Sequence, residues 1–131
     1  MNVNFFLINS SFLVIHLSFL FFQVSAETFS GTQHYLKQNY EAAVDFWSKK
    51  AGQEDPRSLF LLGMMHLEGS GVSLDKLKAL HYLKQAALND YPLAFPILGE
   101  LFEKGGDGIP WDMDQAKHWY NKANETLGSI E

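Results

Sequence analysis

The sequence contains no cysteine, which excludes disulfide bonds, thiolate zinc sites, cysteine nucleophiles and the acylated cysteine of a bacterial lipoprotein. An excess of positive charge is also missing, because 10 Lys and Arg stand against 15 Asp and Glu, for a formal net charge of −5. Phosphate backbones select basic surfaces, so this charge argues against nucleic acid as a partner. A length of 131 residues predicts one domain, with no room for a separate cofactor domain.

The first 26 residues contain no Lys, Arg, Asp or Glu. Within them, the apolar run 12–22 has the length of a signal-peptide core, and small residues precede position 27 as a signal peptidase requires. We therefore expect residues 1–26 to be a signal peptide that leaves Glu27 as the mature N-terminus, and the protein to be periplasmic or secreted. Membrane contact would then be transient. An uncleaved anchor is the alternative, because residues 5–24 are long enough to span a bilayer.

A repeated pattern governs the rest of the chain. One pattern occurs twice, at an offset of 36 to 37 residues: Leu-Gly, then two further glycines, an aspartate and an alanine. Each alanine starts an apolar stripe at helical spacing. The stripe also occurs once earlier, as Ala43, Phe46, Trp47 and Ala51. Such a period is typical of stacked helical units. The pattern predicts an all-α fold, an α-solenoid of three stacked helical hairpins near 28–51, 55–89 and 92–126 within a repeat domain 27–131.

The ends of the helices in the second hairpin can be predicted from single residues. Asp55 is a good N-cap, and Pro56 fits the first helical position, where its missing N–H costs nothing. The helix should end near Glu68, because Gly69 adopts a left-handed conformation without strain. We expect Ser73 to cap the helix that follows.

Three residues inside the expected helices need an explanation. A glycine within a helix costs about 1 kcal/mol relative to alanine. Gly63 and Gly99 are therefore expected to let two helices approach closely, with Ala79 and Ala116 facing them. Pro96 removes a backbone donor, so we expect the helix of the third hairpin to be kinked or to begin late.

Two copies of the repeat carry a family resemblance. Leu62-Gly63, Gly69-Ser70-Gly71-Val72, Asp75, Lys78-Ala79 and Ala86-Ala87 resemble the Sel-one-like repeat, a branch of the tetratricopeptide superfamily, and so does the copy from Leu98-Gly99 to Trp119-Tyr120 and Ala123. The first hairpin, with Tyr40-Glu41 and Ala43, is more similar to the ordinary tetratricopeptide form. The resemblance implies a scaffold or adaptor that binds another protein at a bacterial envelope, without a cofactor. It is also compatible with an immunity-type protein that binds one toxic effector.

The sequence offers little support for metal binding or catalysis. His81 and His118 occupy equivalent repeat positions about 10 Å apart, too far to share a zinc ion. The glycine-rich segment 105–114 lacks the ligand spacing of a calcium loop. We therefore predict no metal, no cofactor and no enzymatic activity. The alternative is an envelope hydrolase or a cell-wall-binding protein, although the family members credited with such roles rely on cysteine-stapled repeats.

The leading helix of the second hairpin is apolar almost all round, which is typical of a buried helix. By the family pattern, Leu59, Leu62 and Gly63 pack inward, and the remaining side chains face a concave surface. Two interpretations stay open: a groove with an apolar floor and an acidic end, or a surface covered by the first hairpin or by a tail through Leu127 and Ile130. On the first interpretation the protein is an exported protein–protein interaction module, and the partner-binding residues are Arg57, Phe60, Met64, Leu67, Leu93, Glu100 and Glu103.

Overall fold

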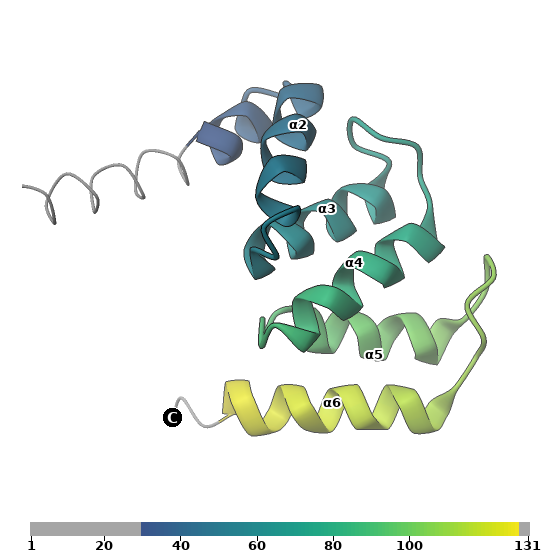
Figure 1. The fold of residues 1–131 in the computed structure, drawn as a ribbon. Helices are drawn as coiled ribbons and strands as arrows, with labels where there is room; N and C mark the ends of the chain where they lie inside the picture. The colour runs from purple at the N-terminus through teal and green to yellow at the C-terminus, as the bar shows by residue number, and fades with distance from the viewer. Residues whose placement is uncertain (1–29, 129–131) are drawn as a thin grey trace, which may run out of the picture.

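The computed structural model describes residues 30–128, which are almost entirely helical (Figure 1). Their only extended pairing is a single bridge between Gly106 and Ile109. The prediction of an all-α solenoid is confirmed. The expected signal peptide lies outside the described residues. A short N-terminal helix at residues 30–36 is followed by five helices: α2 (Tyr40–Ala51), α3 (Pro56–Glu68), α4 (Lys76–Leu88), α5 (Ala94–Lys104) and α6 (Met113–Leu127).

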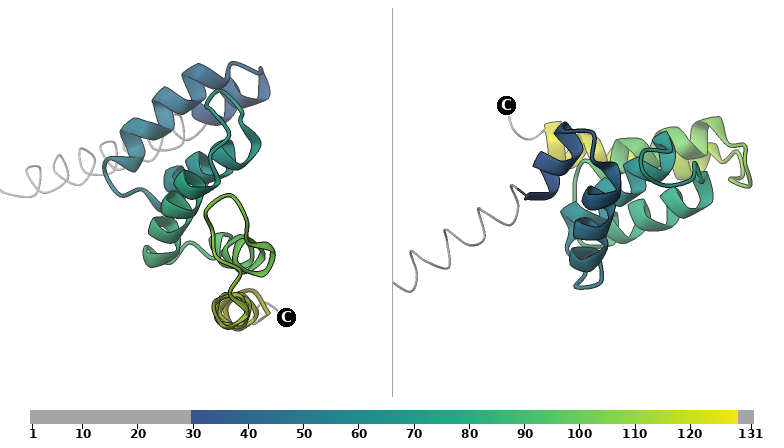
Figure 2. Two further views of the ribbon diagram at one scale, coloured as in Figure 1. Left: turned by 90° about the vertical axis from the view of Figure 1, so that its right-hand side faces the viewer. Right: turned by 90° about the horizontal axis from the view of Figure 1, so that it is seen from above.

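The helices form consecutive antiparallel pairs that stack along the chain. In Figures 1 and 2, α3 and α4 form one hairpin and α5 and α6 another, with the N-terminal helix beside α2. Contacts between neighbouring pairs join α2 to α3 and α4 to α5, and α6 packs on α5. Among the described residues, no helix is long and apolar enough to cross a membrane.

Most predicted helix ends agree with the structure. The Asp55 side chain accepts a 2.8 Å hydrogen bond from the Ser58 amide, and Gly69 ends α3 with φ of 71°. The expected cap at Ser73 is wrong. The N-cap of α4 is Asp75, whose carboxylate accepts from the Lys78 amide at 2.9 Å. An ionised carboxylate is a strong acceptor beside the positive end of a helix dipole, which favours aspartate at this position.

Pro96 does not interrupt a helix, because α5 begins only at Ala94. The proline is therefore the third helical residue. The first four amides of a helix have no intrahelical partner, so its missing N–H costs no hydrogen bond. Of the two expected outcomes, the structure shows the late start.

Both helix-internal glycines lie at close helix contacts, as predicted, and the nearest side chains are those one helical turn after the expected alanines. A Cβ atom at Gly63 would lie 2.8 Å from Leu83 Cγ and 3.4 Å from the Ala79 carbonyl oxygen. At Gly99 it would lie 2.6 Å from Tyr120 Cε1, and its three nearest atoms all belong to the Tyr120 ring. Leu83 and Tyr120 each follow the repeated alanine by one helical turn, which brings their side chains over the glycine.

The core is divided among the hairpins. Trp47, Leu62 and Met65 are buried where the first hairpin meets α3. A second cluster joins the second and third hairpins and includes Leu83 and Leu98, both fully buried. A third cluster, at Phe102, Ile109 and Ala116, lies within the last hairpin. Leu59 of α3 also belongs to the second cluster. Helix α3 therefore contributes to two clusters and lies near the middle of the stack.

Candidate functional site

Two hollows flank α3, and the first lies between α3 and the first hairpin. We call it the N-terminal hollow; its volume is about 280 Å³. The opposite wall consists of Thr32, Tyr35 and Trp47. Side chains three and four positions apart share one face of a helix, so a single stripe of α3 lines the hollow along the whole helix. The stripe comprises Arg57, Phe60, Leu61, Met64, Met65 and Glu68.

The two ends of the N-terminal hollow carry opposite charges. Arg57 is exposed, and no hydrogen bond or ion pair joins its side chain to another of residues 30–128. Glu68 accepts hydrogen bonds from the Tyr35 hydroxyl at 3.1 Å and the Ser70 hydroxyl at 3.3 Å. Burial, together with the bond to Glu68, raises the pKa of Tyr35. Glu68 follows Arg57 by eleven positions along the helix, or about 16 Å at 1.5 Å per residue.

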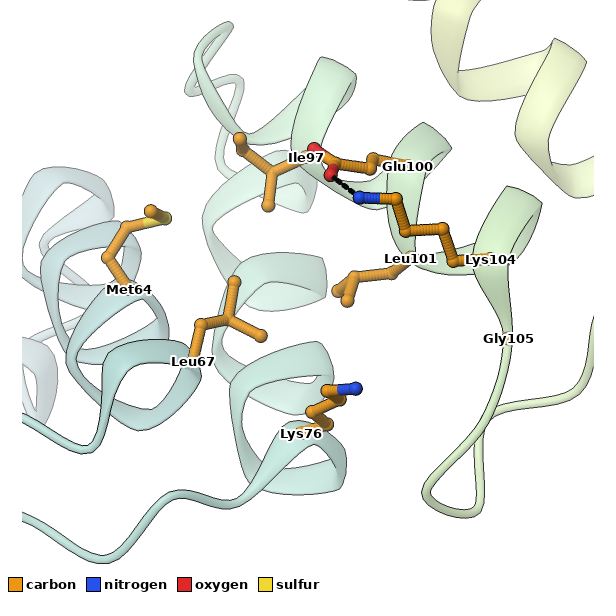
Figure 3. Close-up of a pocket in the computed structure, with 8 residues that line it drawn as sticks. All are labelled: Met64, Leu67, Lys76, Ile97, Glu100, Leu101, Lys104 and Gly105. Carbon is orange, nitrogen blue, oxygen red and sulfur yellow. Dashed lines mark hydrogen bonds and ion pairs between the residues drawn. The ribbon is translucent and has the colours of Figure 1, made fainter.

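The second hollow lies between α3, α5 and the start of α4, and has a volume of about 240 Å³ (Figure 3). We call it the C-terminal hollow. Met64 and Leu67 enter it from α3, and Ile97 and Leu101 face them from α5. Because Met64 also lines the N-terminal hollow, the two hollows meet across α3.

Charged side chains at the rim of the C-terminal hollow are paired within the protein. Lys104 forms an ion pair with Glu100 one turn earlier on α5. The bond to Glu100 raises the pKa of Lys104. Lys76 lies 2.6 Å from Asp107, which belongs to the loop before α6. This rim therefore offers less unsatisfied charge to a partner than the ends of the N-terminal hollow do.

The structure separates the seven predicted site residues into three groups. Arg57, Phe60 and Met64 line the N-terminal hollow, and Met64 is joined by Leu67 and Glu100 in the C-terminal hollow. Leu93 and Glu103 line neither hollow. Leu93 precedes α5 and is 48% exposed.

The two carboxylates of the expected acidic end both have partners within the protein. Glu100 is paired with Lys104. Glu103 accepts a 2.7 Å hydrogen bond from the hydroxyl of Tyr120 on α6, so it lies toward the last helix. This bond, together with burial, raises the pKa of Tyr120 to about 12. The acidic end of the groove stays a prediction, and the structure adds a second pair of charges, at the two ends of α3.

The two interpretations of the α3 surface each describe part of it. Tyr35 and Trp47 of the first hairpin pack beside Leu61 and Met65 and so cover one edge. Phe60, Met64 and Leu67 remain half-buried. Helix α6 packs on α5, and Leu127 near its end is 36% exposed. Ile130 lies outside the described residues.

Within residues 30–128, no three His, Asp or Glu side chains are grouped so that they could hold a metal ion. His81 and His118 are exposed, each beside the aromatic residue that follows it. Asp112 caps α6 by accepting from two amides, and Asp107 pairs with Lys76. The acidic loop therefore serves the fold through capping and an ion pair.

Sequence reasoning missed several residues that line the hollows. Tyr35 and Trp47 belong to another hairpin, so periodicity within α3 could not find them. The stripe itself was visible, because positions 57, 60, 61, 64, 65 and 68 follow helical spacing. Leu61, Met65 and Glu68 of this stripe were not predicted, and neither were their equivalents one repeat later on α5, Ile97, Leu101 and Lys104.

Comparison with known proteins supports the repeat assignment. The Sel1 repeat family matches residues 25–53, 56–91 and 97–125. An uncharacterized protein of Neisseria meningitidis serogroup B is 31% identical over 85 residues, which cover 65% of this chain and 17% of that protein. This chain therefore spans less than a fifth of the length of that relative.

Two crystal structures share the fold. A Sel1 repeat protein from Oxalobacter formigenes is 28% identical, with a TM-score of 0.62 and coverage of 66% of this chain and 65% of the other. A protective antigen of uropathogenic Escherichia coli strains, described as displaying an SLR fold, is 29% identical, with a TM-score of 0.71, and the match covers 78% of this chain and 22% of that one. The chain belongs to the Sel1 repeat family, whose proteins generally act as protein-interaction modules on a fold that is typically non-enzymatic.

Proposed function

We propose that this protein binds another protein through the two hollows that flank α3. The observation that carries the proposal is their apolar lining, which includes half-buried Phe60, Met64 and Leu67, with Met64 common to both hollows and charged side chains at the rims. Their volumes of about 280 and 240 Å³ lie below the roughly 300–1,000 Å³ of typical small-molecule sites. Hollows of this size suit individual side chains of a larger partner.

The composition of this surface resembles the centre of a protein interface. Aromatic residues, methionine and arginine are enriched in such centres, and the N-terminal hollow contains all three kinds at Tyr35, Met64 and Arg57. The flexible thioether of Met64 can adapt to the shape of an incoming side chain. We therefore expect the apolar centre to provide most of the affinity and the charged ends to set the orientation.

A cross-linking experiment tests the location of the binding surface. A photoreactive amino acid is placed at Arg57 or Leu67 in the full chain, and at His81 or Lys117 as exposed controls on α4 and α6. After irradiation in cells of the source organism, the first two positions should capture the same protein and the controls should not. Capture of that protein only at His81 or Lys117 would place the interface elsewhere.

We also propose that the protein is exported and acts as an adaptor or as an immunity-type protein that binds one effector. The charge-free start and the small residues before Glu27 support export, and the small acidic domain is compatible with either role. Intact-mass measurement on protein from the envelope fraction should give a chain that begins at Glu27. Recovery of residues 1–26 in a membrane-embedded form would favour the anchor instead.

A further inference from the structure

We propose that one α-helix of the partner lies along the N-terminal hollow, inserts apolar side chains into it, and presents an acidic side chain to Arg57 and a basic side chain to Glu68. This inference rests on the proposed function and adds the chemistry of the bound segment. It follows from three observations: residues from Arg57 to Glu68 line the groove along α3, the stripe between these two ends is apolar, and the ends carry opposite charges.

A helix fits the polar groups of the groove better than an extended segment does. Every buried backbone amide and carbonyl needs a hydrogen-bond partner. The stripe of α3 between its ends consists of Phe60, Leu61, Met64 and Met65, none of which can satisfy a peptide backbone. On the opposite wall, the Tyr35 hydroxyl already donates to Glu68. A helix bonds its own backbone and needs only an apolar face, as in other helix-in-groove complexes.

The charges at the ends specify what the bound helix carries. Arg57 has no ion-pair partner among residues 30–128, and the partners of Glu68 in that range are the neutral hydroxyls of Tyr35 and Ser70. A carboxylate beside Arg57 and a cation beside Glu68 would give each of these charges an ion-pair partner. The separation of about 16 Å corresponds to side chains at i and i+11, which lie on one face after three turns.

The C-terminal hollow shows why this assignment is specific to the N-terminal one. One repeat later, Glu100 occupies the position of Met64 and Lys104 that of Glu68. These two charges pair with each other on α5. A partner side chain at that rim must compete with an existing ion pair, whereas Arg57 is available without such competition.

Stapled helical peptides provide the probe, because short helices are marginal in water without support. Three peptides share the same apolar face and carry acid and base, two acids, or two bases at i and i+11. Fluorescence anisotropy measures their binding to the full chain, to R57E, to E68K and to the double variant R57E/E68R. Lys117→Glu and Glu125→Lys repeat the single charge changes on the exposed side of α6 as matched controls.

The mixed peptide should bind the unchanged protein best, and each single reversal should weaken it about twofold to fivefold, less at high salt. R57E should then prefer the two-base peptide and E68K the two-acid peptide. The double variant should again bind the mixed peptide with the affinity of the unchanged protein, because the helix can bind in the opposite direction. The two control variants should match the unchanged protein.

Three results would overturn the inference. Equal binding of all peptides to all variants would show that the groove does not select a peptide by its charges. An equal loss of affinity in Lys117→Glu and in R57E would show that the effect comes from the net charge of the protein. Absence of binding by any peptide would show that no helix of this kind enters the hollow. In each case cross-linking at Arg57 and Leu67 reports separately whether a partner contacts this surface, so the proposed function can survive the failure of the inference.

Discussion

The two hollows occupy equivalent places in consecutive repeats, yet they differ in how their charges are used. Positions 61, 64, 65 and 68 of α3 correspond to 97, 100, 101 and 104 of α5, after an offset of 36 residues. On α5 the two charged members, Glu100 and Lys104, neutralise each other. On α3, methionines occupy the centre and the charges stand at opposite ends of the helix. The repeat therefore preserves the backbone, while the side chains at its exposed positions determine what each hollow can recognise.

The largest expected change in stability tests the close helix contacts at the two helix-internal glycines, Gly63 and Gly99. Gly63→Leu should destabilise the protein by about 3 kcal/mol or more, because the new side chain must displace the fully buried Leu83. Gly99→Leu should cost less, because the ring of Tyr120 is partly exposed and can move outward. Urea denaturation measures both.

Gly52→Ala is the matched control for the glycine variants. Gly52 is exposed with φ of −62°, and a Cβ there would make only ordinary contacts at 3.5 Å or more. It should leave the free energy of unfolding almost unchanged. A neutral Gly63→Leu substitution would show that the helices of the second hairpin are not in contact at this point.

Phe60 distinguishes the N-terminal hollow from its counterpart, where the equivalent residue is Pro96. The Phe60 ring is half-buried and lies 5.1 Å from the ring centre of Tyr91. Phe60→Ala should therefore cost about 2 kcal/mol of stability, less than the 3–5 kcal/mol of a fully buried phenylalanine. Thermal melting measures this loss, and a change below about 0.5 kcal/mol would show that Phe60 serves only binding.

Tyr120 adds a pH-dependent contact to the third hairpin that the second lacks, because Leu83 occupies the equivalent position. The hydrogen bond to Glu103 holds the phenol neutral, so its pKa of about 12 exceeds the ordinary value near 10. Stability from this bond should be complete below pH 10 and should decline as the pH rises toward 12. Tyr120→Phe should remove that part of the decline and cost about 1 kcal/mol at pH 7. An identical pH profile for both proteins would contradict this account.

The smallest effect concerns the ion pair of the C-terminal hollow. Lys104→Gln should change stability by about 0.5 kcal/mol or less, because an exposed i,i+4 pair contributes little. It leaves Glu100 unpaired, so the rim of this hollow should then attract basic segments more strongly. Binding of the two-base peptide to Lys104→Gln and to the unchanged protein measures the difference. Unchanged binding would show that this pair does not control recognition.

Local sequence signals predicted the hairpins and most helix ends, because these depend on residues within one or two turns. Asp55 and Gly69 are examples, and Ser73 failed because Asp75 is the better-placed acceptor. Contacts between helices were harder to predict. The pairing of Gly99 with Tyr120 depends on the rotation of α6, which the spacing of apolar residues does not fix.

The candidate site was only partly predictable for the same reason. Arg57, Phe60 and Met64 lie on one helical stripe, so periodicity places them together. Tyr35 and Trp47 reach the same hollow from another hairpin, and their place depends on how the hairpins stack. Glu103 shares the helical face expected for the groove, but its bond to Tyr120 lies toward α6. Rotations and partner choices of this kind are properties of the packed structure.

The most direct test of the central claim is a methyl NMR titration with the mixed-charge stapled peptide. The chain has four methionines, of which Met64 and Met65 line the N-terminal hollow and Met113 begins α6. A peptide helix in that hollow should shift the methyl resonance of Met64 most, with a smaller change at buried Met65 and none at Met113. A shift at Met113 without one at Met64 at saturating peptide would contradict the account.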